Sequence, residues 1–169
     1  MIYIRGKMKV NVIRFILVLL LILTFGMIFN FSNQDSEKSG STSQKVTEAI
    51  TKDIKSIQKL NKNEKAKIID KIEDVIRKIA HFSLYALVGF LLMSLFSTYN
   101  INEKNKIIYT VIIGAIYAIS DEFHQSFISG RSGQVSDVLL DTLGVTVGGL
   151  FILLIIKIVN KFKKNKNSL

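Results

Sequence analysis

The sequence predicts an all-α membrane protein with four transmembrane helices in a bundle. The chain of 169 residues is 49% hydrophobic, and its mean hydropathy is +0.34 although 21% of its residues are charged. The apolar residues gather into four blocks that charged segments separate. Each block is close to the ~20 residues that a helix needs to cross a hydrocarbon core of about 30 Å. The four expected spans, within a single domain over residues 1–169, are residues 12–31, 80–98, 107–123 and 138–159.

A long polar segment, residues 32–76, separates the first two spans. The first span follows a basic start, but its apolar run is too long for a signal peptide and no small-residue cleavage site follows it, so we expect it to be retained. The polar segment begins rich in serine and continues with isoleucines at helical spacing. This pattern predicts amphipathic helices over about residues 44–76, lying on the membrane surface or on the bundle. Asn61, followed three positions later by Glu64, predicts a capping box.

Basic residues in the short loops predict the orientation. With four spans, both termini lie on one side, and both are rich in lysine or arginine, as is the short loop at residues 99–106. The loop between the last two spans carries Arg131 as its only basic residue. We expect the protein in the plasma membrane of the cell. The positive-inside rule then predicts that both termini lie in the cytoplasm and that residues 32–76 lie outside. Arg77 and Lys78 then lie on the outer side, against the trend, which suggests that they have specific partners.

Polar side chains cluster at the expected outer ends of the last three spans. Arg77, His81 and Tyr85 share one helical face by their i, i+4, i+8 spacing, and Asp137 and Asp141 share another. Charged groups near a bilayer core are costly and persist mainly when they are paired or functional. We therefore expect the clusters to meet at one membrane face. The predicted ligand-binding residues are Arg77, Lys78, His81, Tyr85, Asp121, Glu122, His124, Gln125, Arg131, Asp137 and Asp141.

The fourth span carries three further signals. Ser136 is the expected cap of its helix, and Asp137 near the positive helix end has an ordinary electrostatic explanation. Asp141, about one turn deeper, has no such explanation. Gly144 and Gly148 form a small-xxx-small pattern that lets a neighbouring helix approach closely.

Several classes of chemistry lack their usual motifs. The chain has no cysteine, so disulfides, thiolate nucleophiles and cysteine metal sites are excluded. There is no HExxH helix, and the tightest ligand pair is Glu122 with His124, so we expect neither a metal nor another cofactor. No GxSxG, phosphate-binding loop or nucleic-acid module is present. The net charge of +10 sits mainly at helix ends and in the polar segment, which indicates a membrane surface and not nucleic acid.

The polar clusters resemble the motifs of the VanZ-like family of integral membrane proteins. The matching stretches are R-K-x-A-H-F-x-x-Y (residues 77–85), S-D-E-F-H-Q (120–125), G-R-S-G (130–133) and D-V-L-L-D-x-x-G (137–144), with F-S-N-Q (31–34) after the first span. Leu84 stands where many relatives have an acidic residue. The resemblance implies a multi-helix protein of the bacterial cell envelope. The family's namesake is associated with resistance to the glycopeptide teicoplanin.

Three functional hypotheses follow. The favoured one is an envelope protein whose outward-facing polar pocket binds an amphiphile, such as a lipid, a wall precursor or a lipoglycopeptide. The second is a membrane enzyme for envelope lipid headgroups, with His81 or His124 as acid–base and Asp121, Glu122 or Asp141 as partner. The third is a small transporter or assembly subunit. No catalytic motif is present, so binding is favoured over catalysis; an ionic lock between helices also fits the same residues, and the oligomeric state stays open.

Overall fold

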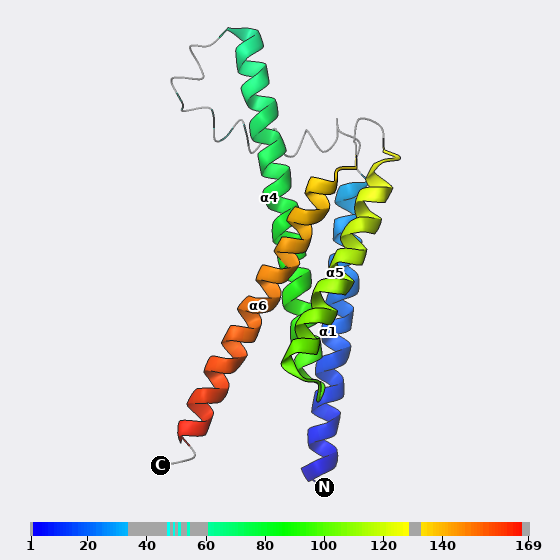
Figure 1. Cartoon of the computed structure of the whole chain (residues 1–169), viewed down its shortest axis with the longest axis vertical. Helices are drawn as coiled ribbons and strands as arrows, with labels where there is room; N and C mark the ends of the chain where they lie inside the picture. Colours follow the sequence, from blue (N-terminus) through cyan, green and yellow to red (C-terminus); the bar gives the residue numbers. More distant parts are fainter. Residues whose placement is uncertain are drawn as a thin grey trace.

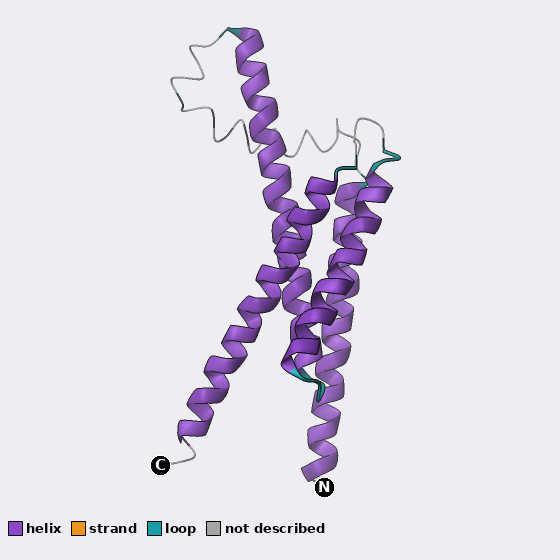
Figure 2. Ribbon diagram, in the orientation of Figure 1, coloured by secondary structure: helices purple, strands orange, loops and turns teal. Residues whose placement is uncertain are grey.

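Four long helices form the architecture. The computed structural model describes residues 2–33, 47, 49, 51, 54, 61–128 and 133–166 (Figures 1 and 2). The helices are α1 (Ile2–Ser32), α4 (Lys62–Ser97), α5 (Glu103–Gln125) and α6 (Val135–Lys166). Each contains a stretch long and apolar enough to cross a membrane. The predicted all-α bundle of four membrane helices is therefore confirmed.

The helices alternate in direction along the bundle. The start of α1 and the end of α6 lie at the same end in Figure 1, and α1 and α5 run away from that end while α4 and α6 run back. Consequently the end of α1, the end of α5 and the start of α6 lie together at the opposite end, which we call the distal end. The polar clusters of the sequence belong to these helix ends and to the part of α4 beside them.

Helix α4 is longer than the span expected at residues 80–98. It begins after Asn61, whose side chain accepts a hydrogen bond from the Glu64 backbone N–H at 2.9 Å while the Glu64 carboxylate accepts one from the Asn61 N–H at 3.4 Å. The predicted capping box is therefore confirmed. Residues 62–97 are one unbroken helix that projects beyond the distal end of the other three (Figure 1). The amphipathic stretch expected over residues 44–60 lies almost entirely outside the described residues.

The closest packing in the bundle joins α4 to α6. A Cβ atom added at Gly148 would clash with the backbone carbonyl of Ala86, and one added at Gly89 would clash with that of Val145. A Cβ at Gly144 would lie 2.7 Å from the carbonyl oxygen of Phe82. The two backbones therefore touch, as the small-xxx-small pattern predicts. Buried apolar residues of all four helices surround this crossing, namely Leu21, Ile28, Tyr85, Val88, Leu91, Leu92, Ala118 and Val145.

Apolar side chains also cover the outside of the bundle. Phe15, Ile22, Ile116, Leu139 and Phe151 are each more than half exposed. Soluble monomers rarely expose apolar area so extensively, whereas lipid solvates it without cost. The outer surface thus identifies a multi-pass membrane protein.

Polar contacts close the bundle at the end that holds the termini. The Arg14 guanidinium of α1 donates to the Thr98 hydroxyl at 2.9 Å and to its carbonyl at 2.8 Å, and it stacks 3.8 Å above the Tyr99 ring. Lys157 of α6 pairs with Glu103 of α5 at 2.6 Å. These contacts hold the ends of α4 and α5 and are remote from the distal end.

We expect Gly148→Leu to destabilise the fold by about 1–3 kcal/mol or more, because the new side chain forces α4 and α6 apart. The measurement is the loss of helical circular dichroism on heating the purified protein in detergent. Gly26→Leu is the matched control, since a Cβ at Gly26 has no atom within 4 Å to meet. Equal thermal midpoints for the two variants would contradict the proposed backbone contact.

Candidate functional site

A polar cavity of about 150 Å³ lies at the distal end among α4, α5 and α6. Ten residues line it: Asp74, Arg77, Lys78, His81, Glu122, Gln125, Gln134, Asp137, Leu140 and Asp141. Seven of these are among the residues predicted from the sequence. The structure therefore brings the polar clusters of three separate helices to one place, which we call the distal cavity.

Ion pairs on the exposed side of the distal cavity link α4 to α6. Lys78 Nζ lies 3.6 Å from Asp74 on its own helix and 3.3 Å from Asp137 on α6, and Arg77 lies 3.6 Å from Asp74. The Arg77 and Lys78 side chains are 34% and 36% exposed. The partners expected for these cations are thus Asp137 and Asp74. Sequence reasoning missed Asp74, although its i, i+3 and i, i+4 spacing to the two cations was a usable signal.

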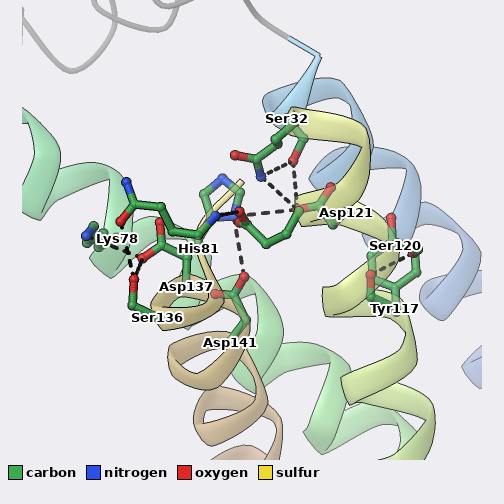
Figure 3. A network of polar contacts seen from close by, with 12 residues as sticks. Ser32, Lys78, His81, Tyr117, Ser120, Asp121, Ser136, Asp137 and Asp141 are labelled. Atoms are coloured by element: carbon green, nitrogen blue, oxygen red, sulfur yellow. Dashed lines mark hydrogen bonds and ion pairs between the residues drawn. The ribbon is translucent and has the colours of Figure 1, made fainter. Parts of the chain in front are cut away.

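Deeper in the site, His81 stands between two buried carboxylates. Its Nδ1 atom lies 4.0 Å from Asp121 Oδ2 of α5 and 4.0 Å from Asp141 Oδ2 of α6 (Figure 3). The His81 side chain is 17% exposed, whereas those of Asp121 and Asp141 are 1% and 2% exposed. The three side chains come from three different helices. Asp141, which had no ordinary explanation in the sequence, is therefore part of this cluster.

Two neutral side chains hold the Asp121 carboxylate in place. The Ser32 hydroxyl at the end of α1 donates to Asp121 Oδ2 at 2.9 Å, and Gln125 Nε2 donates to the same oxygen at 3.1 Å (Figure 3). Gln125 Nε2 also donates to the Ser32 hydroxyl oxygen at 3.2 Å. Sequence reasoning predicted Gln125 and missed Ser32, whose only signal was its place in the F-S-N-Q stretch. This network ties α1 to α5 at the distal end.

The start of α6 is fixed against the end of α5. The Glu122 carboxylate is buried and accepts a hydrogen bond from the Gln134 backbone N–H at 3.0 Å. Helix α6 begins at Val135, so Ser136 lies inside its first turn and the expectation that Ser136 caps the helix is wrong. The Ser136 hydroxyl instead lies 3.3 Å from the side-chain oxygens of Gln134 and Asp137.

Among the described residues, the predicted Tyr85, Asp121 and His124 do not line the distal cavity. Tyr85 is fully buried beneath it, with its ring 6.5 Å from that of His81. The His124 ring stacks on that of Phe29 of α1 with 4.8 Å between centroids, so this histidine does not line the cavity. Arg131 lies outside the described residues, so its predicted role stays a prediction.

The arrangement has two chemical zones. The exposed zone carries Arg77 and Lys78, which suit the oxygens of a phosphate or carboxylate. The buried zone carries His81 with Asp121 and Asp141, a set that suits proton exchange or the binding of a cation. The Arg77 and Lys78 side chains are about one third exposed, whereas the two buried carboxylates are almost fully covered. A ligand that enters from solvent would therefore contact the two cations first.

The helices and the site together define a multi-pass membrane protein with a polar site at one end of its bundle. The family model VanZ/LLP1 matches residues 15–157, so the chain belongs to the VanZ/LLP1 family. No curated protein and no solved structure matched the chain. The resemblance read from the sequence motifs is therefore confirmed.

We expect Ser32→Ala to lower the free energy of unfolding by about 1.5–3 kcal/mol, because it removes a hydrogen bond to a buried carboxylate. Ser83→Ala is the matched control: among the described residues, the exposed Ser83 hydroxyl bonds only to the Ile79 carbonyl of its own helix, so a change within about 0.5 kcal/mol is expected. Denaturant titration in detergent micelles measures both. A Ser32 variant as stable as wild type would show that the Asp121 network does not hold α1.

Proposed function

We propose that this protein binds the anionic headgroup of an envelope amphiphile in the distal cavity and thereby lowers susceptibility to teicoplanin-type glycopeptides. The single observation that carries the proposal is the cavity itself, with Arg77 and Lys78 on its exposed side. Each cation already pairs with an acidic neighbour, Arg77 with Asp74 and Lys78 with Asp137. A headgroup therefore binds by replacing one of these carboxylates as the partner of the cation.

The position of the cavity supports this choice of ligand. Exposed apolar side chains of α5 and α6, such as Phe123, Val135 and Leu139, extend to the same end of the bundle, so acyl chains can stay among lipid while the headgroup reaches the cavity. Under the positive-inside rule, the basic residues in the termini and in the 99–106 loop support a cytoplasmic location for the other end. The distal cavity then faces outward from the plasma membrane, where wall precursors and glycopeptides are found.

Expression in a susceptible Gram-positive host tests this function. We expect the wild-type chain to raise the inhibitory concentration of teicoplanin more than that of vancomycin, and the Arg77→Gln, Lys78→Gln double variant to lose this protection. Lys157→Gln is the matched control, because it removes a cation from an exposed ion pair at the other end of the bundle. With membrane levels confirmed by immunoblot, unchanged teicoplanin susceptibility would argue against the namesake-like role.

A membrane enzyme is the second candidate, and the position of His81 favours it. A histidine between two buried carboxylates resembles the arrangement in which an imidazole transfers protons while an acidic neighbour supports its charged form. The reacting headgroup would enter through the distal cavity, which His81 and Asp141 line. In this proposal His81 is the acid–base group and Asp121 and Asp141 orient it.

Lipid profiles distinguish the enzyme from the binding protein. We expect cells expressing wild type to differ in envelope lipid composition from cells expressing His81→Ala, with mass spectrometry of extracted lipids as the measurement. His124→Ala is the matched control, because this histidine stacks on Phe29 away from the cavity and its loss should leave the wild-type profile. Identical profiles for wild type and His81→Ala would leave binding as the function.

A further inference from the structure

The carboxylates of Asp121 and Asp141 are buried charges of the distal end that lack a described lysine or arginine partner. Both side chains are at most 2% exposed, yet no described lysine or arginine forms an ion pair with either. The described cations near them, Arg77 and Lys78, pair with Asp74 and Asp137 nearer the surface. Two anions in a low-dielectric bundle need a positive charge between them or a proton.

The geometry around His81 fits a cation. One ligand atom each from His81, Asp121 and Asp141 lie within 4.8 Å of one another, and His81 Nδ1 is 4.0 Å from the nearest oxygen of each carboxylate. Around a tetrahedral zinc ion with bonds of about 2.1 Å, ligand atoms stand about 3.4 Å apart. The two distances from His81 therefore need to shorten by roughly 0.6 Å, and the distance between the two carboxylates by at most about 1.4 Å, for the three side chains to share one ion.

Unused oxygens point to the same conclusion. Asp141 Oδ2 and Asp121 Oδ1 are buried and make no hydrogen bond to any described residue. A buried carboxylate oxygen without a donor is costly, and native proteins satisfy nearly all of them. Asp141 Oδ2 is the oxygen that faces His81, so this unsatisfied acceptor is directed into the cluster.

The surroundings of Asp121 are those of a supported metal ligand. Ser32 and Gln125 donate hydrogen bonds to its Oδ2 atom and fix the orientation of the carboxylate, as the neighbours of metal ligands do. Each ligand projects from a different helix, so an ion would join α4, α5 and α6 at the distal end. His81 and Asp141 also line the distal cavity, which gives an ion a route to the cluster.

We propose that His81, Asp121 and Asp141 form a binding site for one divalent transition-metal ion of the Zn²⁺ or Mn²⁺ class. One imidazole nitrogen and two carboxylates are ligands that these ions accept. Three protein ligands are also the number found where a metal keeps a position for water or a substrate oxygen. Sequence reasoning expected no metal because it searched for ligands close together in the chain, whereas these three meet only across helices. The site does not depend on the headgroup function proposed above.

Metal content of the purified full-length protein in detergent tests the site. After incubation with Zn²⁺, desalting and removal of any polyhistidine tag, we expect one ion per chain for wild type and none for Asp141→Asn or His81→Gln. Asp137→Asn is the matched control, because Asp137 lies one turn earlier on α6 and pairs with Lys78 instead of His81. Wild type without bound zinc, or equal loss from Asp137→Asn and Asp141→Asn, would overturn the proposal.

A spectroscopic measurement keeps the test decisive if the variants do not fold. Pulsed electron paramagnetic resonance of the Mn²⁺-loaded wild type should show coupling to an imidazole nitrogen. The chain has only two histidines, and His124→Gln should retain this coupling because His124 lies against Phe29. Absence of nitrogen coupling in wild type would overturn the site. Neither measurement involves antibiotic susceptibility or lipid profiles, so failure of the metal site and failure of the headgroup function are distinguishable.

Discussion

The contact between the backbones of α4 and α6 determines where the polar residues meet. Gly144 lies against the carbonyl of Phe82 and Gly148 against that of Ala86, so no side chain separates the helices at these points. Phe82 follows His81 directly, and Gly144 comes about one turn after Asp141. The register of this contact therefore sets the distance between His81 and Asp141. Larger residues at the glycines would move the helices and with them the imidazole and the carboxylate.

Much of the fold could be predicted from the sequence because its signals are local. Four apolar blocks of sufficient length predicted the spans, and an asparagine followed by a glutamate at the right spacing predicted the start of α4. The glycine pattern of α6 predicted a close helix neighbour but not which one. The partner of α6 depends on the shapes of all four helices, which no local pattern contains.

The candidate site could be predicted only in part, for the same reason. Spacing along one helix grouped His81 with Arg77 and grouped Asp137 with Asp141, and all four residues line the distal cavity. Spacing did not reveal that Ser32, 89 positions before Asp121, hydrogen-bonds to it. Spacing grouped His124 with the cavity residues, yet its ring stacks on Phe29 of α1. Contacts between helices are what the sequence alone leaves undetermined.

The unbroken course of α4 has a mechanical consequence. A helix of 36 residues at about 1.5 Å per residue is about 54 Å long, well beyond the roughly 30 Å of a hydrocarbon core. Its projecting part and the part that carries Arg77, Lys78 and His81 share one continuous hydrogen-bonded backbone without proline. A tilt of the projecting part therefore acts as a lever on the cavity wall. A molecule that binds the projecting part of α4 beyond the lipid is therefore mechanically coupled, through the stiff helix, to Arg77, Lys78 and His81.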